Sequence, residues 1–266
     1  MTEPRATGCA DLHIHTLASD GTSGVVEILD HVERSSRLDV IAITDHERID
    51  AAIAARSIAR DRGLRVEVIV GEEITTRGGH LLGLFLERSI PPLRSLRWSI
   101  AAVHEQGGIA VPAHPLVPYP LCAQGFVLRG LLDDPDARFH PDALETFNPT
   151  TLGRPWHGRV VRFADRYGLA RIGNSDAHVI ESIGTGWTTF PGASAGDLRR
   201  AILARQTQHH GSFDGGPLQL RTFGRQLRKY GRDIGATLRG RVLRDGSRRD
   251  LGYPVELRPG GREGAG

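Results

Sequence analysis

The sequence has few cysteines and no long apolar run. Its 266 residues include two cysteines, Cys9 and Cys122, which are too few for a disulfide framework and indicate a reducing compartment. No stretch approaches the roughly 18 consecutive apolar residues of a transmembrane helix, and residues 1–8 contain no apolar segment typical of a secretory signal. We therefore expect a cytoplasmic protein that does not enter the membrane.

Lysine is almost absent as well, since Lys229 is the only one and arginine supplies the other basic residues. Residues 213–266 hold twelve Arg or Lys against six Asp or Glu, whereas the net charge of the whole chain is only +3. Few aromatic residues separate these cations, so we do not expect a nucleic-acid-binding tail. Apolar residues at helical spacing from Phe223 to Leu238 instead predict a basic amphipathic helix, which could pack on the domain or join two subunits in a homo-oligomer.

Up to about residue 210, short β-branched runs alternate with helical patterns. Strands are predicted at residues 11–16, 38–44, 65–71, 80–86, 109–112, 143–147 and 170–173, and helices at 24–35, 50–60, 93–105, 156–167 and 195–204. This alternation predicts βα units around a largely parallel sheet. We expect one α/β domain over residues 1–212 and an extension over residues 213–266.

Histidines and carboxylates cluster at the ends of the predicted strands. His13 and His15 lie two residues apart on the first strand, so we expect their side chains to leave the same face as Asp11. Others follow or open later strands: His46, Glu72, Glu73, His80, His114, Asp176 and His178. The carboxyl ends of parallel strands meet at one end of an α/β barrel. Histidine and carboxylate ligands without cysteine suit Zn, Mn or Fe, so we predict a site for two or three divalent metal ions.

Five short motifs stand in order along residues 9–205. They are Asp11–His15 with Asp20-Gly21, Thr44-Asp45-His46, Gly71–Thr75, Ala113-His114-Pro115 and Ser175-Asp176-Ala177-His178. In order and spacing they resemble the motifs of the PHP (polymerase and histidinol phosphatase) metallohydrolases. The resemblance implies a distorted, TIM-like (β/α)7 barrel with a two- or three-metal site at its C-terminal face.

The same resemblance implies three sets of metal ligands. They are His13, His15, Glu73 and Asp176 for the first metal, a bridging Glu73 with His80 and His114 for the second, and Asp20, His46 and His178 for the third. Glu73 is chosen over Glu72 because the family's ligand stands two residues after the glycine. Asp11 and Asp45 are expected to orient imidazole rings instead of binding metal.

The resemblance implies a phosphoesterase that acts on a small phosphorylated molecule, such as a nucleotide, a nucleoside bisphosphate or a short oligonucleotide. A hydroxide between two metals would attack phosphorus, with Glu73, Asp176 and His178 as catalytic residues; His178 either binds metal or protonates the leaving oxygen. Arg154 and His157 are candidates to bind the phosphate.

Two alternatives stay open. One is a metallohydrolase of a carboxylic or carbamate ester, which needs the same metals. The other is a catalytically silent PHP module that binds a partner protein. The complete set of potential ligands argues against the silent module.

Overall fold

The computed structural model describes residues 7–213 except 120, 151 and 152. The strands are β1 (Thr7–Ile14), β2 (Val40–Ile43), β3 (Glu67–Thr76), β4 (Gly79–Leu84), β5 (Ile109–Pro112), β6 (Ala143–Phe147), β7 (Ala170–Gly173), β8 (Gly186–Pro191) and β9 (Gln208–Gly211). The α-helices are α1 (Val25–Ser35), α2 (Asp50–Asp61), α3 (Leu96–Glu105), α4 (Gly125–Leu132), α5 (His157–Tyr167) and α6 (Ala195–Leu203). The short 3-10 helices are η1 (Ala137–Phe139), η2 (Arg154–Trp156) and η3 (Ile180–Ser182). The predicted extension over residues 213–266, apart from Phe213, lies outside the described residues.

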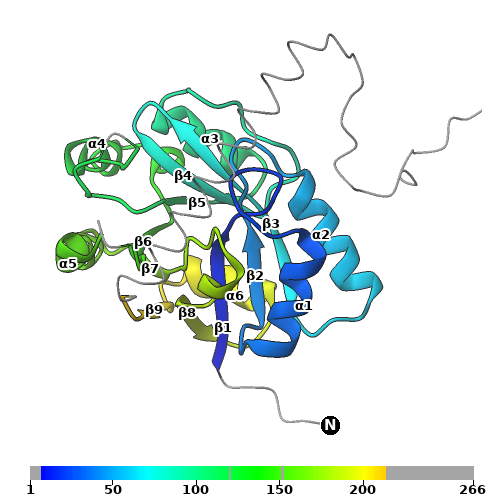
Figure 1. The fold of residues 1–266 in the computed structure, drawn as a ribbon. Coiled ribbons are helices and arrows are strands. Elements are labelled where there is room, and N and C mark those ends of the chain that lie inside the picture. The colour runs from blue at the N-terminus through cyan, green and yellow to red at the C-terminus, as the bar shows by residue number, and fades with distance from the viewer. Residues whose placement is uncertain (1–6, 120, 151–152, 214–266) are drawn as a thin grey trace, which may run out of the picture. The chain divides into compact units, whose positions relative to one another are not determined.

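The strands form a curled sheet in the order β5-β4-β3-β2-β1-β8-β9, with β6 and β7 as a separate pair (Figure 1). β1, β2 and β3 pair in parallel, as do β6 and β7. The other four ladders are antiparallel, so the prediction of a largely parallel sheet is wrong. One reason is that two residues join β3 to β4, and so short a connection can only form a hairpin.

The mixed α/β class is confirmed, but the regular alternation of a (β/α)7 barrel is not seen in the described part of the chain. No helix separates β3 from β4 there, and β9 is a strand that the polar sequence Gln-His-His did not indicate. Helix α4 was also not predicted, because Gly125 and Gly130 lower its helix propensity.

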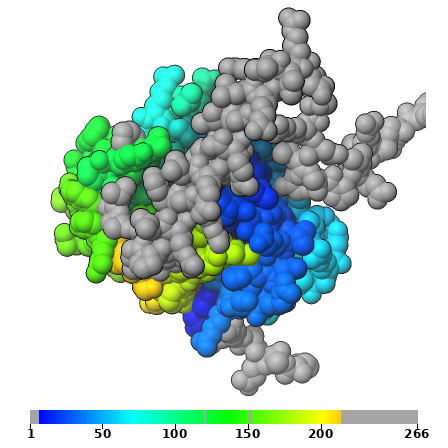
Figure 2. All heavy atoms as spheres, in the orientation of Figure 1, coloured from blue at the N-terminus to red at the C-terminus, as the bar shows by residue number. Residues whose placement is uncertain are grey.

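Apolar side chains at helical spacing attach the helices to the sheet. In α1, Val25, Ile28, Leu29 and Val32 are buried on one stripe and join a core cluster with Ile41 of β2. Figure 2 shows that the side chains of α1 and α2 form a continuous surface on this side of the molecule. The remaining strand faces share a second cluster with α6, so both sides of the sheet are packed. Among the described helices, none is long and apolar enough to cross a membrane.

Candidate metal centre

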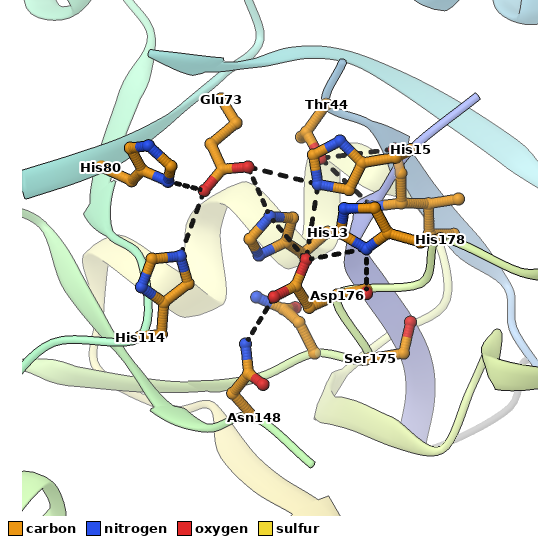
Figure 3. Close-up of polar contacts among 12 residues, drawn as sticks. His13, His15, Thr44, Glu73, His80, His114, Asn148, Ser175, Asp176 and His178 are labelled. Atoms are coloured by element: carbon orange, nitrogen blue, oxygen red, sulfur yellow. Dashed lines mark hydrogen bonds and ion pairs between the residues drawn. The ribbon is translucent and has the colours of Figure 1, made fainter. Parts of the chain in front are cut away.

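All nine side chains predicted to bind metal lie at one end of the curled sheet; Figure 3 labels all of them except Asp20 and His46. They come from the ends of strands or from the loops beside them: His13 and His15 with β1, Asp20, His46, Glu73 in β3, His80 in β4, His114, and Asp176 with His178. β4 runs antiparallel to β3, so the beginning of β4 reaches the end where β3 finishes. This reversal brings His80 to the same place as ligands that follow parallel strands.

A bulge in β1 turns the two histidines of the first motif toward this site. Asp11 pairs with Ile41 and Ile14 pairs with Ile43, and the register shifts between them. Paired residues share a face, so Asp11 and Ile14 both lie on the helix side. In a regular strand, residues three positions apart would lie on opposite faces. The inserted residue leaves His13 and His15 on the opposite side. The prediction that Asp11 shares their face is therefore wrong.

Glu73 is the centre of the cluster, because five imidazoles converge on its two carboxylate oxygens. Figure 3 shows those of His13, His15, His80 and His114 around it. Oε2 lies 3.2 Å from His13 Nε2, 3.2 Å from His15 Nε2 and 3.4 Å from His46 Nε2. Oε1 lies 2.7 Å from His80 Nδ1 and 3.2 Å from His114 Nε2. Each carboxylate oxygen therefore faces its own set of imidazoles, an arrangement that would suit a carboxylate shared by two cations.

The adjacent carboxylate, Glu72, faces away from the cluster. It accepts a hydrogen bond from the Ser89 hydroxyl at 2.5 Å and another from the Ile90 amide at 2.8 Å. Burial raises the pKa of Glu72 to about 7. Alternation along β3 thus sends two consecutive glutamates to different surroundings.

A second group of ligand atoms lies nearer the surface. His178 Nε2 is 3.0 Å from Asp20 Oδ2, and His46 Nε2 is 3.8 Å from the same oxygen. Asp20 is followed by Gly21, where a Cβ atom would come within 2.3 Å of the His15 carbonyl oxygen. Only glycine allows the chain to pass so close to β1, and this packing holds the Asp20 loop against the cluster.

The donor set fits divalent metal ions. Three imidazole nitrogens, His13 Nε2, His15 Nε2 and His80 Nδ1, are buried without a hydrogen-bond partner among the described residues. The potential ligands also form three sets, and within each set the ligand atoms lie within 4.8 Å of one another. The sets are His15, Asp20, His46 and His178; His13, His15 and Asp176; and His46, Glu73 and His80. Buried nitrogen atoms that face no donor or acceptor in a favourable direction, grouped with carboxylates, are what imidazole-binding cations require.

Charges within the cluster depend strongly on one another. Burial alone would raise the pKa of Glu73, but the neighbouring imidazoles, His13 first, hold it well below its usual range. Burial would lower the pKa of His15, but the nearby carboxylates of Asp176 and Glu73 raise it to about 10. Without metal, protons on the imidazoles therefore balance the carboxylates, and a bound cation would replace those protons.

Two residues of the cluster have left-handed backbone conformations. The φ angle is 31° at His114 and 51° at Asp176. Such conformations cost on the order of 1–3 kcal/mol each in residues other than glycine and are concentrated at functional sites. The surrounding hydrogen bonds must hold these two side chains in place.

The two aspartates expected to orient imidazoles have other partners. Asp11 accepts hydrogen bonds from the Ser175 hydroxyl and amide and from the Gly184 amide. Asp45 accepts from the amide and hydroxyl of Thr16 and from the Ser19 hydroxyl. Both carboxylates therefore hold loops that carry the cluster. Among the described residues neither is seen to bond directly to an imidazole, and Asp45 reaches a ring through the Ser19 hydroxyl, which lies 3.4 Å from His15 Nδ1.

Outside the nine cluster residues, Glu145 is a carboxylate that bonds directly to an imidazole, that of His13. The sequence patterns did not distinguish it from a structural carboxylate. Its Oε1 accepts a hydrogen bond from His13 Nδ1 at 2.9 Å. Cys122, treated only as a compartment marker, has its Sγ 3.2 Å from His114 Nδ1. The one sequence signal for Glu145 was its place near the carboxyl end of a strand, in the segment Ala143–Phe147.

A cavity of about 330 Å³ adjoins the cluster. It is lined by Glu73, Asp176 and His178, with the apolar residues Val117 and Leu121 beside them. A larger groove, of about 550 Å³, has no histidine in its lining, so size alone does not mark the site. The two predicted phosphate-binding residues lie outside the lining of the smaller cavity. The Arg154 guanidinium lies over the Phe213 ring, 5.6 Å from its centre, and His157 Nδ1 bonds to the Thr146 carbonyl oxygen.

Known proteins are similar to parts of this chain in sequence and to its fold. The PHP-associated family model matches residues 154–207. An uncharacterized protein of Methanocaldococcus jannaschii is 37% identical over 119 residues, which are 41% of this chain and 68% of that protein. A 5'-3' exoribonuclease of Haemophilus influenzae is 32% identical over 105 residues, or 38% of this chain and 37% of the enzyme.

The fold is also similar to a solved structure from Bacteroides vulgatus, a two-domain protein containing a predicted PHP-like metal-dependent phosphoesterase. The TM-score is 0.64 at 21% identity, over 83% of this chain and 70% of that one. At this identity the likeness establishes the fold. Together with the family match and the five motifs, it leads to one identification: the chain belongs to the PHP domain family.

Proposed function

We propose that this protein is a metal-dependent phosphoesterase that hydrolyses a small phosphorylated molecule. The convergence of five imidazoles on the buried Glu73 carboxylate, beside a cavity of about 330 Å³, carries the proposal. Two or three divalent ions, Mn, Fe or Zn, held by such ligands would activate water and neutralise charge on a phosphoryl group. The exoribonuclease relative and the PHP-like phosphoesterase fold support the same reaction class.

The proposed catalytic residues are Glu73, Asp176 and His178, all of which line the cavity. Glu73 and Asp176 would hold an inner cation together with His13 and His15, and Glu73 would hold a second one with His80 and His114; Asp176 Oδ1 lies 3.3 Å from His13 Nε2. His178 Nε2 would either bind an outer cation, beside Asp20 and His46, or hold a proton for the leaving oxygen. One nitrogen cannot do both, so the two roles exclude each other.

We propose a nucleotide or nucleoside bisphosphate as the substrate. Val117, Tyr119 and Leu121 line the cavity beside the ligands, and an exposed aromatic ring suits stacking on a base. The phosphate-binding roles of Arg154 and His157, and pairing of two chains through residues 213–266, stay predictions.

Metal content and product release test the proposal together. The full chain would be purified without added metal, its metals measured by elemental analysis, and its turnover followed on phosphomonoesters, phosphodiesters, nucleoside bisphosphates and carboxylic esters. We expect two or more equivalents of metal, and phosphate release that Glu73→Gln abolishes. Bound metal with ester hydrolysis alone would indicate the metallohydrolase of a carboxylic or carbamate ester. No metal and no metal-restored turnover would indicate the silent module.

A further inference from the structure

Glu145 lies beside His13 and belongs to none of the metal-binding sets. Its side chain is fully buried in the middle of β6, where an unpaired carboxylate would be strongly unfavourable. Four hydrogen bonds satisfy it. Oε1 accepts from His13 Nδ1 at 2.9 Å and from Asn174 Nδ2 at 2.8 Å, and Oε2 accepts from the His114 amide at 2.7 Å and from Asn148 Nδ2 at 3.1 Å.

Each partner of Glu145 acts as a donor. The backbone amide of His114 can only donate. Asn174 and Asn148 use their own oxygens to accept from the backbone amides of Leu12 and Thr150, which fixes the orientation of both side-chain amides. A carboxylate is therefore the one side chain of this size that can satisfy all four groups, since the amide of a glutamine would bring a donor against two donors.

This carboxylate determines which nitrogen of His13 is free. Because Oε1 accepts from Nδ1, the neutral ring carries its proton there and leaves the Nε2 lone pair directed at Glu73 and Asp176. A histidine that binds metal through one nitrogen commonly donates the other N–H to a carboxylate, which fixes the ring and strengthens the ligand.

The same carboxylate reaches two further cluster residues through short paths. It holds the backbone of His114, whose φ of 31° is unfavourable without such support. Asn148 Nδ2, while bonded to Glu145, also lies 3.2 Å from Asp176 Oδ2. Glu145 thus links three members of the inner part of the cluster that come from β1, the loop after β5 and the loop after β7.

We propose that Glu145 is a positioning residue that preorganises the inner metal site by fixing the tautomer of His13, the backbone of His114 and, through Asn148, the carboxylate of Asp176. It does not touch the cavity, and its effect reaches the chemistry only through these three residues. This role rests on the proposed metal-dependent function.

The test is metal binding to the metal-stripped full chain, measured by calorimetric titration with Mn²⁺ and by the visible absorption of added Co²⁺. We expect Glu145→Gln to weaken the tightest class of sites by about 10- to 100-fold and to change the Co²⁺ spectrum, as is usual when a ligand loses its hydrogen-bond partner. Glu145→Asp, which keeps the charge but is shorter, should recover part of the affinity.

Glu72→Gln is the matched control. Glu72 is also a buried carboxylate, one residue from Glu73, but one of its two partners is the Ser89 hydroxyl, which can turn and accept from an amide. We expect this variant to bind metal as the unmodified chain does. A merely structural Glu145 would lower the unfolding free energy of the metal-free protein and leave its metal affinity unchanged.

The outcomes separate the two levels of inference. No Mn²⁺ binding by the unmodified chain would overturn the metal-dependent function itself. Binding by that chain with equal affinity in Glu145→Gln would overturn the positioning role alone. If circular dichroism shows that Glu145→Gln does not fold, Asn148→Ala replaces it. This variant removes the link to Asp176, together with one hydrogen bond to Glu145 and one from the Thr150 amide, but it keeps Glu145 bonded to His13 and to the His114 amide. Unchanged affinity and spectrum in that variant would then overturn the role.

Discussion

The inner and outer parts of the metal centre differ in how firmly the protein holds them. In the inner group, His13, His15 and Glu73 have side chains that are at most 2% exposed; His13 and Glu73 lie in strands, and His15 directly follows β1. In the outer group, Asp20, His46 and His178 have side chains that are 14–27% exposed, and all three come from loops. Burial and strand backbone make the inner group a preformed site, whereas the outer group can adjust to a ligand or a substrate.

The largest effect should come from Glu73, since five imidazoles converge on it and, in the proposed function, it would join two cations. Glu73→Gln should lower turnover by more than about 100-fold, which is the drop expected when a metal ligand loses only its hydrogen-bond partner. We expect the variant to keep at most the outer cation, which Asp20, His46 and His178 would hold. Phosphate release and elemental analysis on the same preparation measure both. Full metal content in the variant would contradict the bridging arrangement.

A smaller loss is expected in the outer group. Asp20→Asn keeps the shape of the side chain but removes the charge that faces His46 and His178. We expect the loss of one metal equivalent and about a 10-fold lower turnover, while the inner metals stay bound. Asp61→Asn, an exposed change at the end of α2, is the control. If Asp20→Asn loses every metal at once, the two groups are not independent.

Removal of metal should lower thermal stability in two steps. A weak chelator should release the outer cation first, and a strong one the inner cations. A ligand present at 100 times its dissociation constant adds about 2.7 kcal/mol to the unfolding free energy, so the stronger chelator should cause the larger drop in Tm. Calorimetric scans of the chain and of Glu73→Gln measure this, and an equal response of both proteins would argue against the inner site as its source.

The smallest effect is expected at an imidazole–carboxylate pair outside the centre. His104 is 22% exposed and lies 2.9 Å from Asp142, with its other nitrogen 2.9 Å from the Arg138 carbonyl oxygen. The hydrogen bond to Asp142 raises the pKa of His104 above its usual 6.5. The pair should therefore stabilise the fold fully below that unfolded pKa and lose its contribution as pH rises through the higher folded pKa.

His104→Gln tests this pH dependence. Partial exposure limits the pair to no more than about 1 kcal/mol, which is far less than the loss expected at the buried centre. Urea denaturation of both proteins near about pH 5.5 and pH 9 should give the larger difference in unfolding free energy at the lower pH. An equal difference at both values would mean that protonation of His104 contributes nothing.

Local patterns predicted β1 to β7 and the described α-helices other than α4, because each depends on near neighbours, whereas β8 and β9 were not predicted. The apolar stripe of α1 and the buried run of β2 are examples, and both are found where they were expected. Predictions failed where distant segments decide the outcome. The direction of β4 depends on its hairpin with β3, and the polar strand β9 forms by pairing with β8.

The chain's own sequence specified which chemical groups the site contains, since the motifs place nine imidazoles and carboxylates beside strand ends. Only the tertiary structure decided how those groups point and what supports them. A bulge in β1 turns His13 and His15 away from Asp11, and Glu145 meets His13 across 132 positions of sequence. Residue types and local spacing can be read along a chain, whereas hydrogen bonds between distant segments arise only when the sheet curls and brings their ends together.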